Sequence, residues 1–150
     1  MESAIKCLRA DDSYQISGQE FINVGKLFLA GLGGFIGSTL RYAATGYVQQ
    51  LSRSIDFPYG TLAVNLIGCF IIGFLSQLAE SRGVFTAESR TFVFIGILGG
   101  FTTFSAFGNE TMNLWREGQN WLAMANIAGH LVLGLGAVWI GRTLAYQIWR

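Results

Sequence analysis

Hydrophobic residues fall along this chain in four long runs separated by short polar segments. The runs extend over residues 27–48, 58–79, 91–112 and 121–146. A helix needs about 20 mostly apolar residues to cross the hydrocarbon core of a bilayer. The pattern therefore predicts an all-α membrane protein with four transmembrane helices. Pro58 opens the second run, where a first helical turn tolerates the missing N–H.

The segment before the first run, residues 1–26, is polar. It has neither an early apolar core nor a small-residue cleavage site, so it does not read as a signal peptide. We expect a polar N-terminal tail over residues 1–26 and one transmembrane domain over residues 27–150.

The composition supports a membrane protein. Hydrophobic residues make up 51% of the chain and charged residues 13%, whereas soluble domains carry roughly 25% charged residues. The formal net charge of +1 gives no indication of a nucleic-acid partner. Cys7 and Cys69 lie in unlike settings, which argues against a disulfide framework or a metal site. Cys69 is most simply a small buried hydrophobe.

The basic residues favour one orientation weakly. Four crossings would place both termini on one side, which would hold Lys6, Arg9, Lys26, Arg82, Arg90, Arg142 and Arg150, against Arg41, Arg53 and Arg116 on the other. The positive-inside rule then favours cytoplasmic termini. Without Lys6 and Arg9 the bias is modest. We therefore expect a multi-pass protein of the inner (plasma) membrane that can insert either way.

The third run contains residues that a plain lipid-crossing helix does not need. Between Gly96 and Glu110 it has four glycines, three hydroxyl residues and three phenylalanines. We expect the helix to break at Gly99 and Gly100. The break would free carbonyl groups, which at membrane depth need water, hydroxyls or a cation as partners. This segment predicts the core of a small channel or transporter, with a monovalent cation on backbone oxygens.

Two other runs carry polar side chains at depth. Thr61, Asn65 and Gly68 lie on one face of the second helix. Asn65 is either a helix–helix hydrogen bond or a donor lining a pore. In the first run, Arg41 either reaches the headgroups or holds a fixed charge at a pore mouth. Gly33 and Gly37 form a G-x-x-x-G pair, which lets two helices approach closely.

Phe104 and Phe107 are three residues apart and share a helix face. They are either ordinary lipid or core contacts, or rings whose positive edges line the path of a small anion. Glu110 extends the same side by one turn. Its carboxylate could pair with a cation, hold a proton or orient a hydroxyl.

Three segments carry a family resemblance: G-G-F-I-G-S-T-L-R-Y (33–42), Y-G-T-L-A-V-N-L-I-G-C-F (59–70) and G-G-F-T-T-F-S-A-F-G-N-E (99–110). They resemble the signature segments of the Fluc/CrcB fluoride channels, in the same order. The third segment is the most specific. The resemblance covers about residue 27 to the C-terminus and leaves out the polar tail.

The resemblance implies an antiparallel, dual-topology dimer of four-helix subunits with two fluoride pores. The third helix would be broken mid-membrane, and a structural sodium ion at the dimer interface would be bound by the carbonyls of Gly99 and Thr102. The pore would be lined by Phe104, Phe107, Asn65, Thr103, Ser105 and Glu110, with Arg41 as a vestibule charge or anchor. The dimer would be of identical chains or of this chain with a paralogue.

The sequence departs from the family pattern in two places. Ala106 stands where a hydroxyl residue is common, which removes one polar contact. The tyrosine and serine that the fourth helix usually contributes are not found in place. Asn126 and His130, spaced i, i+4, either take their positions in the pore or form a packing hydrogen bond between helices.

We expect passive export of fluoride, which enters acid-exposed cells as neutral HF and is trapped as the anion. No ATP site or catalytic acid pair is visible, so no enzyme activity is predicted. One alternative is a proton-coupled exporter of small cations or drugs, although the first run lacks the membrane carboxylate such exporters use. Another is an assembly subunit that transports nothing.

Overall fold

The structure, a computed structural model, describes residues 23–149. Of the predicted tail, residues 1–26, the first 22 residues lie outside this range. Arg150 also lies outside it. The described chain consists of α2 (Val24–Ser52), α3 (Tyr59–Arg82), α4 (Ala87–Arg90), η2 (Thr91–Leu98), α5 (Gly99–Phe101), α6 (Phe104–Arg116), α7 (Asn120–Ala128), η3 (Gly129–Leu133) and α8 (Gly134–Ile148). The segments η2 and η3 are π-helical.

Four helical stretches are long and apolar enough to cross a membrane. They are Val24–Ser52, Tyr59–Arg82, Ala87–Arg116 and Asn120–Ile148, which confirms the predicted number of spans. Most ends extend a few residues beyond the apolar runs because the helices continue into polar flanks. Asn23, for example, accepts hydrogen bonds from the N–H groups of Gly25 and Lys26 and so begins α2 within the predicted tail.

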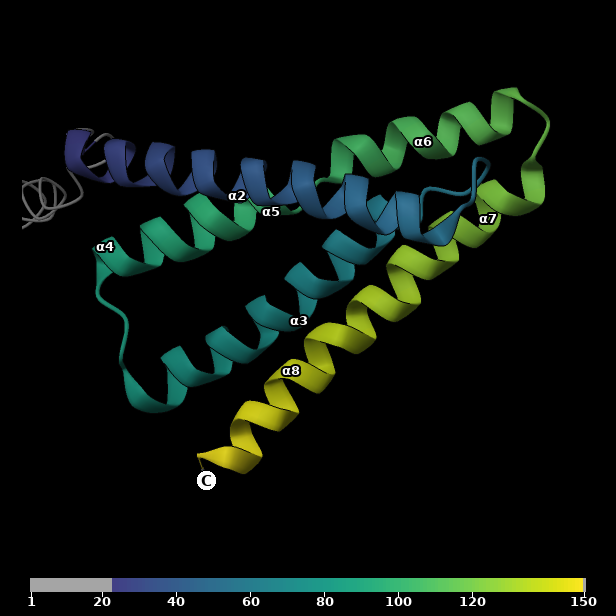
Figure 1. The fold of residues 1–150 in the computed structure, drawn as a ribbon. Helices are drawn as coiled ribbons and strands as arrows, with labels where there is room; N and C mark the ends of the chain where they lie inside the picture. The colour runs from purple at the N-terminus through teal and green to yellow at the C-terminus, as the bar shows by residue number, and fades with distance from the viewer. Residues whose placement is uncertain (1–22, 150) are drawn as a thin grey trace, which may run out of the picture.

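The helices form two pairs that diverge from a common end. In Figure 1, α2 runs alongside η2, which follows α4, and alongside α5, while α3 runs beside α8. The pairs spread apart toward α4 and the C-terminus and approach one another where α6 and α7 form a hairpin. The first pair confirms the close approach predicted for the G-x-x-x-G motif. A Cβ at Gly33 would collide with the Phe92 carbonyl, and one at Gly37 with the Ile97 carbonyl.

The predicted break at Gly99 and Gly100 is wrong in position. Gly99 is helical, with φ −64° and ψ −35°. The extended residues are Thr102 (φ −88°, ψ 157°) and Thr103 (φ −150°, ψ 114°). The physical reason is that Gly100 serves packing instead, since a Cβ there would lie 2.8 Å from the carbonyl oxygen of Gly34. Helix α5 ends at Phe101, directly before the position where the side chains of Asn65 and Thr103 replace the missing backbone hydrogen bonds.

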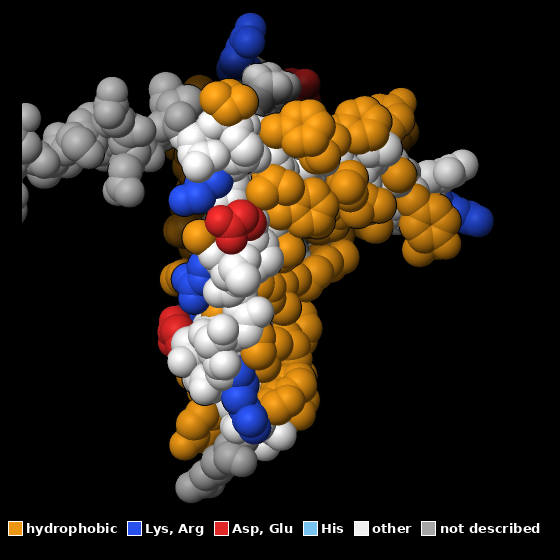
Figure 2. Space-filling view, turned by 90° about the vertical axis from the view of Figure 1, so that its left-hand side faces the viewer, with side chains coloured by type: hydrophobic (Ala, Val, Ile, Leu, Met, Phe, Trp, Pro, Cys, Tyr) orange, Lys and Arg blue, Asp and Glu red, His pale blue; other side chains and the backbone are white. Residues whose placement is uncertain are grey.

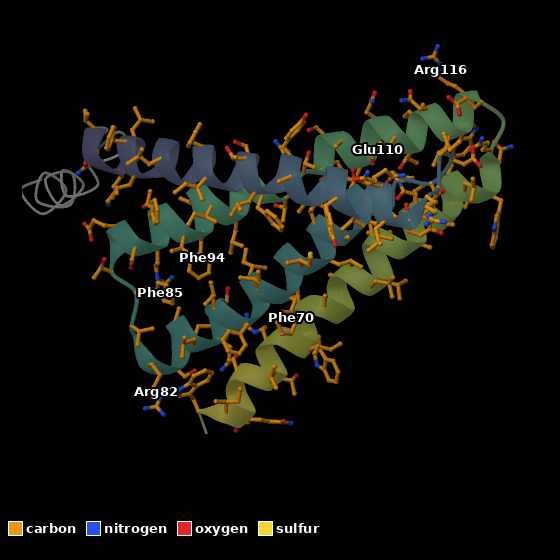
Figure 3. The ribbon with its side chains drawn as sticks, in the orientation of Figure 1. Phe70, Arg82, Phe85, Phe94, Glu110 and Arg116 are labelled. Carbon is orange, nitrogen blue, oxygen red and sulfur yellow. The ribbon has the colours of Figure 1, made fainter. Side chains whose placement is uncertain are left out.

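The outer surface is mostly apolar. Seen from the left-hand side of Figure 1, hydrophobic side chains cover a broad area, and most of the charged ones lie in a column beside it (Figure 2). Arg82 and Arg116 lie at opposite ends of the molecule (Figure 3). Such a surface suits a chain whose sides face lipid and whose ends face water.

Candidate functional site

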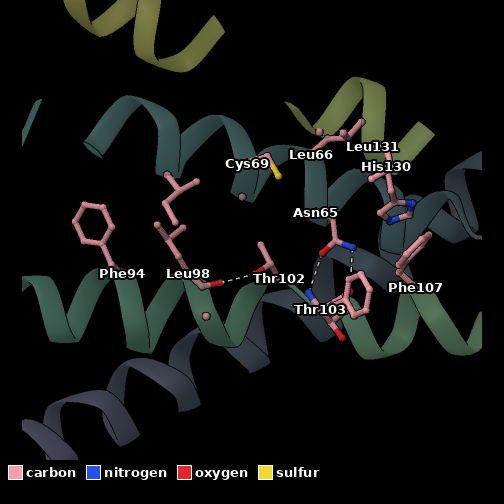
Figure 4. Close-up of a pocket in the computed structure, with 15 residues that line it drawn as sticks. Asn65, Leu66, Cys69, Phe94, Leu98, Thr102, Thr103, Phe107, His130 and Leu131 are labelled. Atoms are coloured by element: carbon pink, nitrogen blue, oxygen red, sulfur yellow. Dashed lines mark hydrogen bonds between the residues drawn. The ribbon is translucent and has the colours of Figure 1, made fainter. Parts of the chain in front are cut away.

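The interruption between α5 and α6 is held by a side chain from α3. The Nδ2 group of Asn65 donates to the carbonyl of Thr103 at 3.1 Å, and the N–H of Thr103 donates to Oδ1 of Asn65 at 2.8 Å (Figure 4). Thr103 is buried, so its backbone groups need partners. Asn65 supplies both, and the amide is thereby fixed in one orientation.

The same interruption changes the partners of two carbonyls. In a continuous helix the N–H of Thr103 would bond to Gly99, and the N–H of Ala106 to Thr102. Here Thr103 donates to Asn65, and Ala106 donates to Oγ1 of Thr103 at 3.1 Å. The carbonyls of Gly99 and Thr102 therefore lose their usual helical donors. These are the two groups expected to bind sodium, and oxygens freed in this way suit a hard cation.

Thr61, Asn65 and Gly68 of α3 all contact the segment that runs from the end of α5 into α6. This confirms the prediction that the three residues share one face of the helix. Asn65 binds Thr103 as described. One turn before it, the hydroxyl of Thr61 donates to Oε1 of Glu110 at 2.6 Å. One turn after it, Gly68 leaves space that the methyl group of Thr102 approaches closely. Of the three roles considered for Glu110, the structure shows the contact with a hydroxyl.

A cavity of about 370 Å³ opens beside the interruption. It is lined by polar groups of Asn65, Thr102, Thr103 and His130, by the rings of Phe94, Phe104 and Phe107, and by Leu66, Gly68, Cys69, Ile72, Leu98, Gly99, Leu131 and Gly134. The ring centroids of Phe104 and Phe107 are 5.4 Å apart with a 59° angle between planes. Phe104 is 82% exposed in the single chain. The two predicted rings thus line the same cavity as the predicted asparagine.

A second cavity, of about 680 Å³, lies toward α2. Arg41, Glu110 and Thr103 line it, as does Ala106. Thr103 contributes to both cavities. Its hydroxyl is 3.2 Å from that of Ser105. Ser105 itself lines neither of these two cavities.

The two candidates on the fourth span separate. Asn126 is fully buried, and its Nδ2 donates to the hydroxyl of Thr111 at 2.9 Å, which joins α7 to α6. It does not line the cavity beside Phe107, so its contact is a packing hydrogen bond. His130 does line that cavity, and its ring lies 4.3 Å from that of Phe107, centroid to centroid.

Sequence reasoning missed several residues of this site. Phe94, Leu98 and Cys69 line the cavity, but nothing marks them in apolar runs that are rich in similar residues. The bond between Thr61 and Glu110 joins residues that are far apart in sequence. The one sequence signal for a polar partner of Thr61 is its position one helical turn from Asn65, on the same face of α3.

Comparison with known proteins identifies the family. Residues 28–142 match the family described as CrcB-like protein, Camphor Resistance (CrcB). A protein of Opitutus terrae is 49% identical over 121 residues, covering 79% of this chain and 90% of its own length. One from Methylobacillus flagellatus is 45% identical over 116 residues, covering 77% of this chain and 91% of its own length. Both carry the name fluoride-specific ion channel FluC.

A protein of Parabacteroides distasonis with the same name is 44% identical over 123 residues, covering 82% of this chain and 94% of its own length. None of these three names supports a multidrug exporter. The matched region contains the interrupted third span, both cavities and every site residue described above. The chain belongs to the CrcB family.

Proposed function

We propose that this protein is a fluoride-selective channel that lets fluoride leave the cytoplasm passively. Its relatives are named for this activity and match over nearly their whole length. One observation of the structure supports the proposal at the level of the site. Asn65, Thr103, Phe104 and Phe107 line one cavity where the third span is interrupted, and such interruptions are where membrane proteins place ion sites.

Asn65 provides a donor of fixed direction. Its Nδ2 carries two hydrogens, and only one of them has a partner among residues 23–149, the Thr103 carbonyl. The second hydrogen is free to bind an anion in the cavity. Thr103 and Ser105 add hydroxyl groups that can turn to donate. Because Thr103 lines both cavities, fluoride would pass it on the way between them.

The phenylalanine rings contribute their edges. An aromatic edge is electropositive, and it can replace part of the hydration shell of a small anion. Phe104 and Phe107 are tilted toward each other at 59°, so that they do not stack face to face. Fluoride is small and has a high charge density, so it gains most from contacts with electropositive ring edges. A larger anion does not fit a narrow pore.

The working unit would be an antiparallel dimer of this chain. Phe104 and Gly99 are exposed in the single chain although both line the cavity. A second copy would cover them and complete the pore. The Gly99 and Thr102 carbonyls of both copies would then hold a structural sodium ion at the interface, with the third span broken at mid-membrane. Sodium would supply charge there, and Asn65 would keep the carbonyls aimed at it.

The protein would reside in the inner membrane and insert in both orientations, since the charge bias between its ends is modest. Arg41 lines the larger cavity together with Glu110 and would draw anions to the entrance. The inside-negative potential contributes about 2.3 kcal/mol per 100 mV toward export of one negative charge. No chemical energy source is needed.

The test is ion efflux from liposomes that contain the purified protein, followed with fluoride- and chloride-selective electrodes and no pH gradient. We expect rapid loss of fluoride and retention of chloride. Chloride leaving as fast as fluoride would refute a fluoride channel. Flux that requires a pH gradient would favour the proton-coupled exporter, and the absence of any flux would favour an assembly subunit.

Phe104→Ile is the matched variant for this test. Isoleucine keeps the apolar bulk but has no electropositive edge. We expect fluoride flux to fall about tenfold, which corresponds to about 1.4 kcal/mol, while the protein still elutes as a folded species in size-exclusion chromatography. Unchanged flux would show that the ring edges do not form the path.

A further inference from the structure

The two ring nitrogens of His130 have different environments. Nδ1 lies 3.0 Å from the carbonyl oxygen of Asn126. A carbonyl can only accept, so Nδ1 carries the hydrogen. In the neutral ring Nε2 is then a bare acceptor. Nε2 is buried and has no hydrogen-bond partner among residues 23–149. Buried polar atoms without a partner are rare in proteins, and such an atom often binds a water molecule or an ion.

The imidazole is at the wall of the cavity that contains Asn65, Phe104 and Phe107. His130 is the second residue of η3, a π-helical segment in the fourth span. Such π-helical segments are frequent at functional sites. Its ring lies against that of Phe107 (Figure 4). Nε2 is buried in the single chain, so fluoride would reach it when the Phe107 ring moves aside while Nδ1 keeps its bond to Asn126.

Few other groups near His130 can change charge. The lining residues from α3 include one titratable group, the thiol of Cys69. Within the described range, no Asp, Glu, Lys or Arg of η2, α5, α6 or η3 lines the cavity. Glu110 and Arg41 line a different cavity. Apart from the Cys69 thiol, His130 is therefore the lining residue of this cavity, among residues 23–149, whose charge can change with pH.

We propose that His130 is a proton-controlled fluoride ligand of the conduction path. When the ring is neutral, the lone pair of Nε2 repels an anion. When the ring is protonated, Nε2–H donates to fluoride and the imidazolium charge attracts it. The inference rests on the proposed channel function and adds a regulation to it: conduction increases under acid conditions, in which fluoride enters cells as HF.

A spectroscopic test does not depend on flux. His130 is the single histidine of the 150-residue chain, so ¹⁵N-histidine labelling of tag-free protein in nanodiscs gives the signals of one ring. We expect the Nδ1–H tautomer at alkaline pH. Sodium fluoride should move the titration midpoint to higher pH, because fluoride binds the protonated ring more tightly, and sodium chloride at equal ionic strength should not. The Nε2–H tautomer, or a midpoint indifferent to fluoride, would overturn the proposal.

A flux test follows from the same chemistry. Fluoride efflux is measured at equal pH on both sides between about pH 5 and 8, the range in which histidine titrates. Leakage of HF from protein-free vesicles is subtracted. On the alkaline side of the midpoint, flux should fall roughly tenfold per pH unit as the protonated fraction falls. His130→Gln should give a flat profile, and Ile67→Ala, at an exposed side chain on α3 outside both cavities, should keep the wild-type slope.

The outcomes separate the two proposals. Fluoride-selective flux with equal pH profiles in wild type and His130→Gln would refute the role of His130 and leave the channel function standing. The absence of fluoride flux at every pH would refute the channel function itself. If His130→Gln does not fold, the spectroscopic titration of the wild-type ring decides alone.

Discussion

The pair formed by α3 and α8 and the junction between α5 and α6 both lie in predominantly apolar runs, yet they are held together differently. Along α3 and α8 the backbones touch. A Cβ at Gly73 would collide with the Val138 carbonyl, and one at Gly141 with the Phe70 carbonyl. At the junction, by contrast, the backbone is extended and is fixed by the Asn65 amide and the Thr103 hydroxyl.

The difference shows how one small chain separates support from conduction. The glycine contacts form a close seam between α3 and α8, and their strength depends on how well the two backbones fit together. Side-chain hydrogen bonds hold an irregular segment and leave carbonyls and donors available for ions. The two regions share α3, so one face of this helix supports α8 while Asn65 on another supports the junction. Variants should therefore affect folding in the seam and conduction at the junction.

The largest effect is expected in the seam. Gly141→Val places its side chain against the backbone of Phe70, which cannot move aside, so α3 and α8 must separate. We expect almost no folded protein in size-exclusion chromatography. Gly136→Val on the same helix, where a Cβ meets no atom within 4 Å, is the control and should fold normally. Equal yields would refute a close seam.

The next largest effect is expected at the junction. Asn65→Leu leaves the N–H and the carbonyl of Thr103 without partners, at about 1–3 kcal/mol each. The interruption should then lose its fixed geometry, and fluoride flux should fall roughly a hundredfold per folded protein. Ile67→Ala, at a side chain on α3 that is 46% exposed, should leave flux near wild type. Flux retained in Asn65→Leu would mean that the amide neither binds fluoride nor holds the junction.

The sequence predicted the four spans better than the details of the junction, and it did not predict the seam between α3 and α8. The four spans follow from apolar runs, and the shared face of Thr61, Asn65 and Gly68 follows from helical periodicity. The position of the break does not, because Gly100 looks like a helix breaker until its contact with Gly34 is known. The separate roles of Asn126 and His130 also depend on tertiary contacts. Local spacing puts both on one face but does not say which one reaches the cavity.

A smaller effect is expected at the edge of the junction. Thr61→Val removes the only donor that Glu110 has within residues 23–149. A single hydrogen bond typically contributes about 0.5–1.5 kcal/mol, so fluoride flux should fall a few-fold. Thr61→Ser retains the hydroxyl and should restore most of the flux. Failure of serine to do so would assign the effect to packing around the methyl group of Thr61.

The smallest effect is expected at the water-facing end of the seam. Arg142 and Glu80 form an ion pair at 2.5 Å, with side chains 41% and 56% exposed. Exposed pairs contribute about 0–1 kcal/mol and are screened by salt. Arg142→Gln should lower the melting temperature slightly at low salt and leave fluoride flux unchanged. A large loss of flux in this variant would show that seam and junction are coupled.

The most direct test of the whole account is an experimental density map of the protein in lipid nanodiscs with sodium fluoride. We expect extended backbone at Thr102 and Thr103, the Asn65 amide bonded to Thr103, and Phe104 and Phe107 bordering the pore. A continuous helix from Ala87 to Arg116, with both rings turned into the lipid, would contradict it.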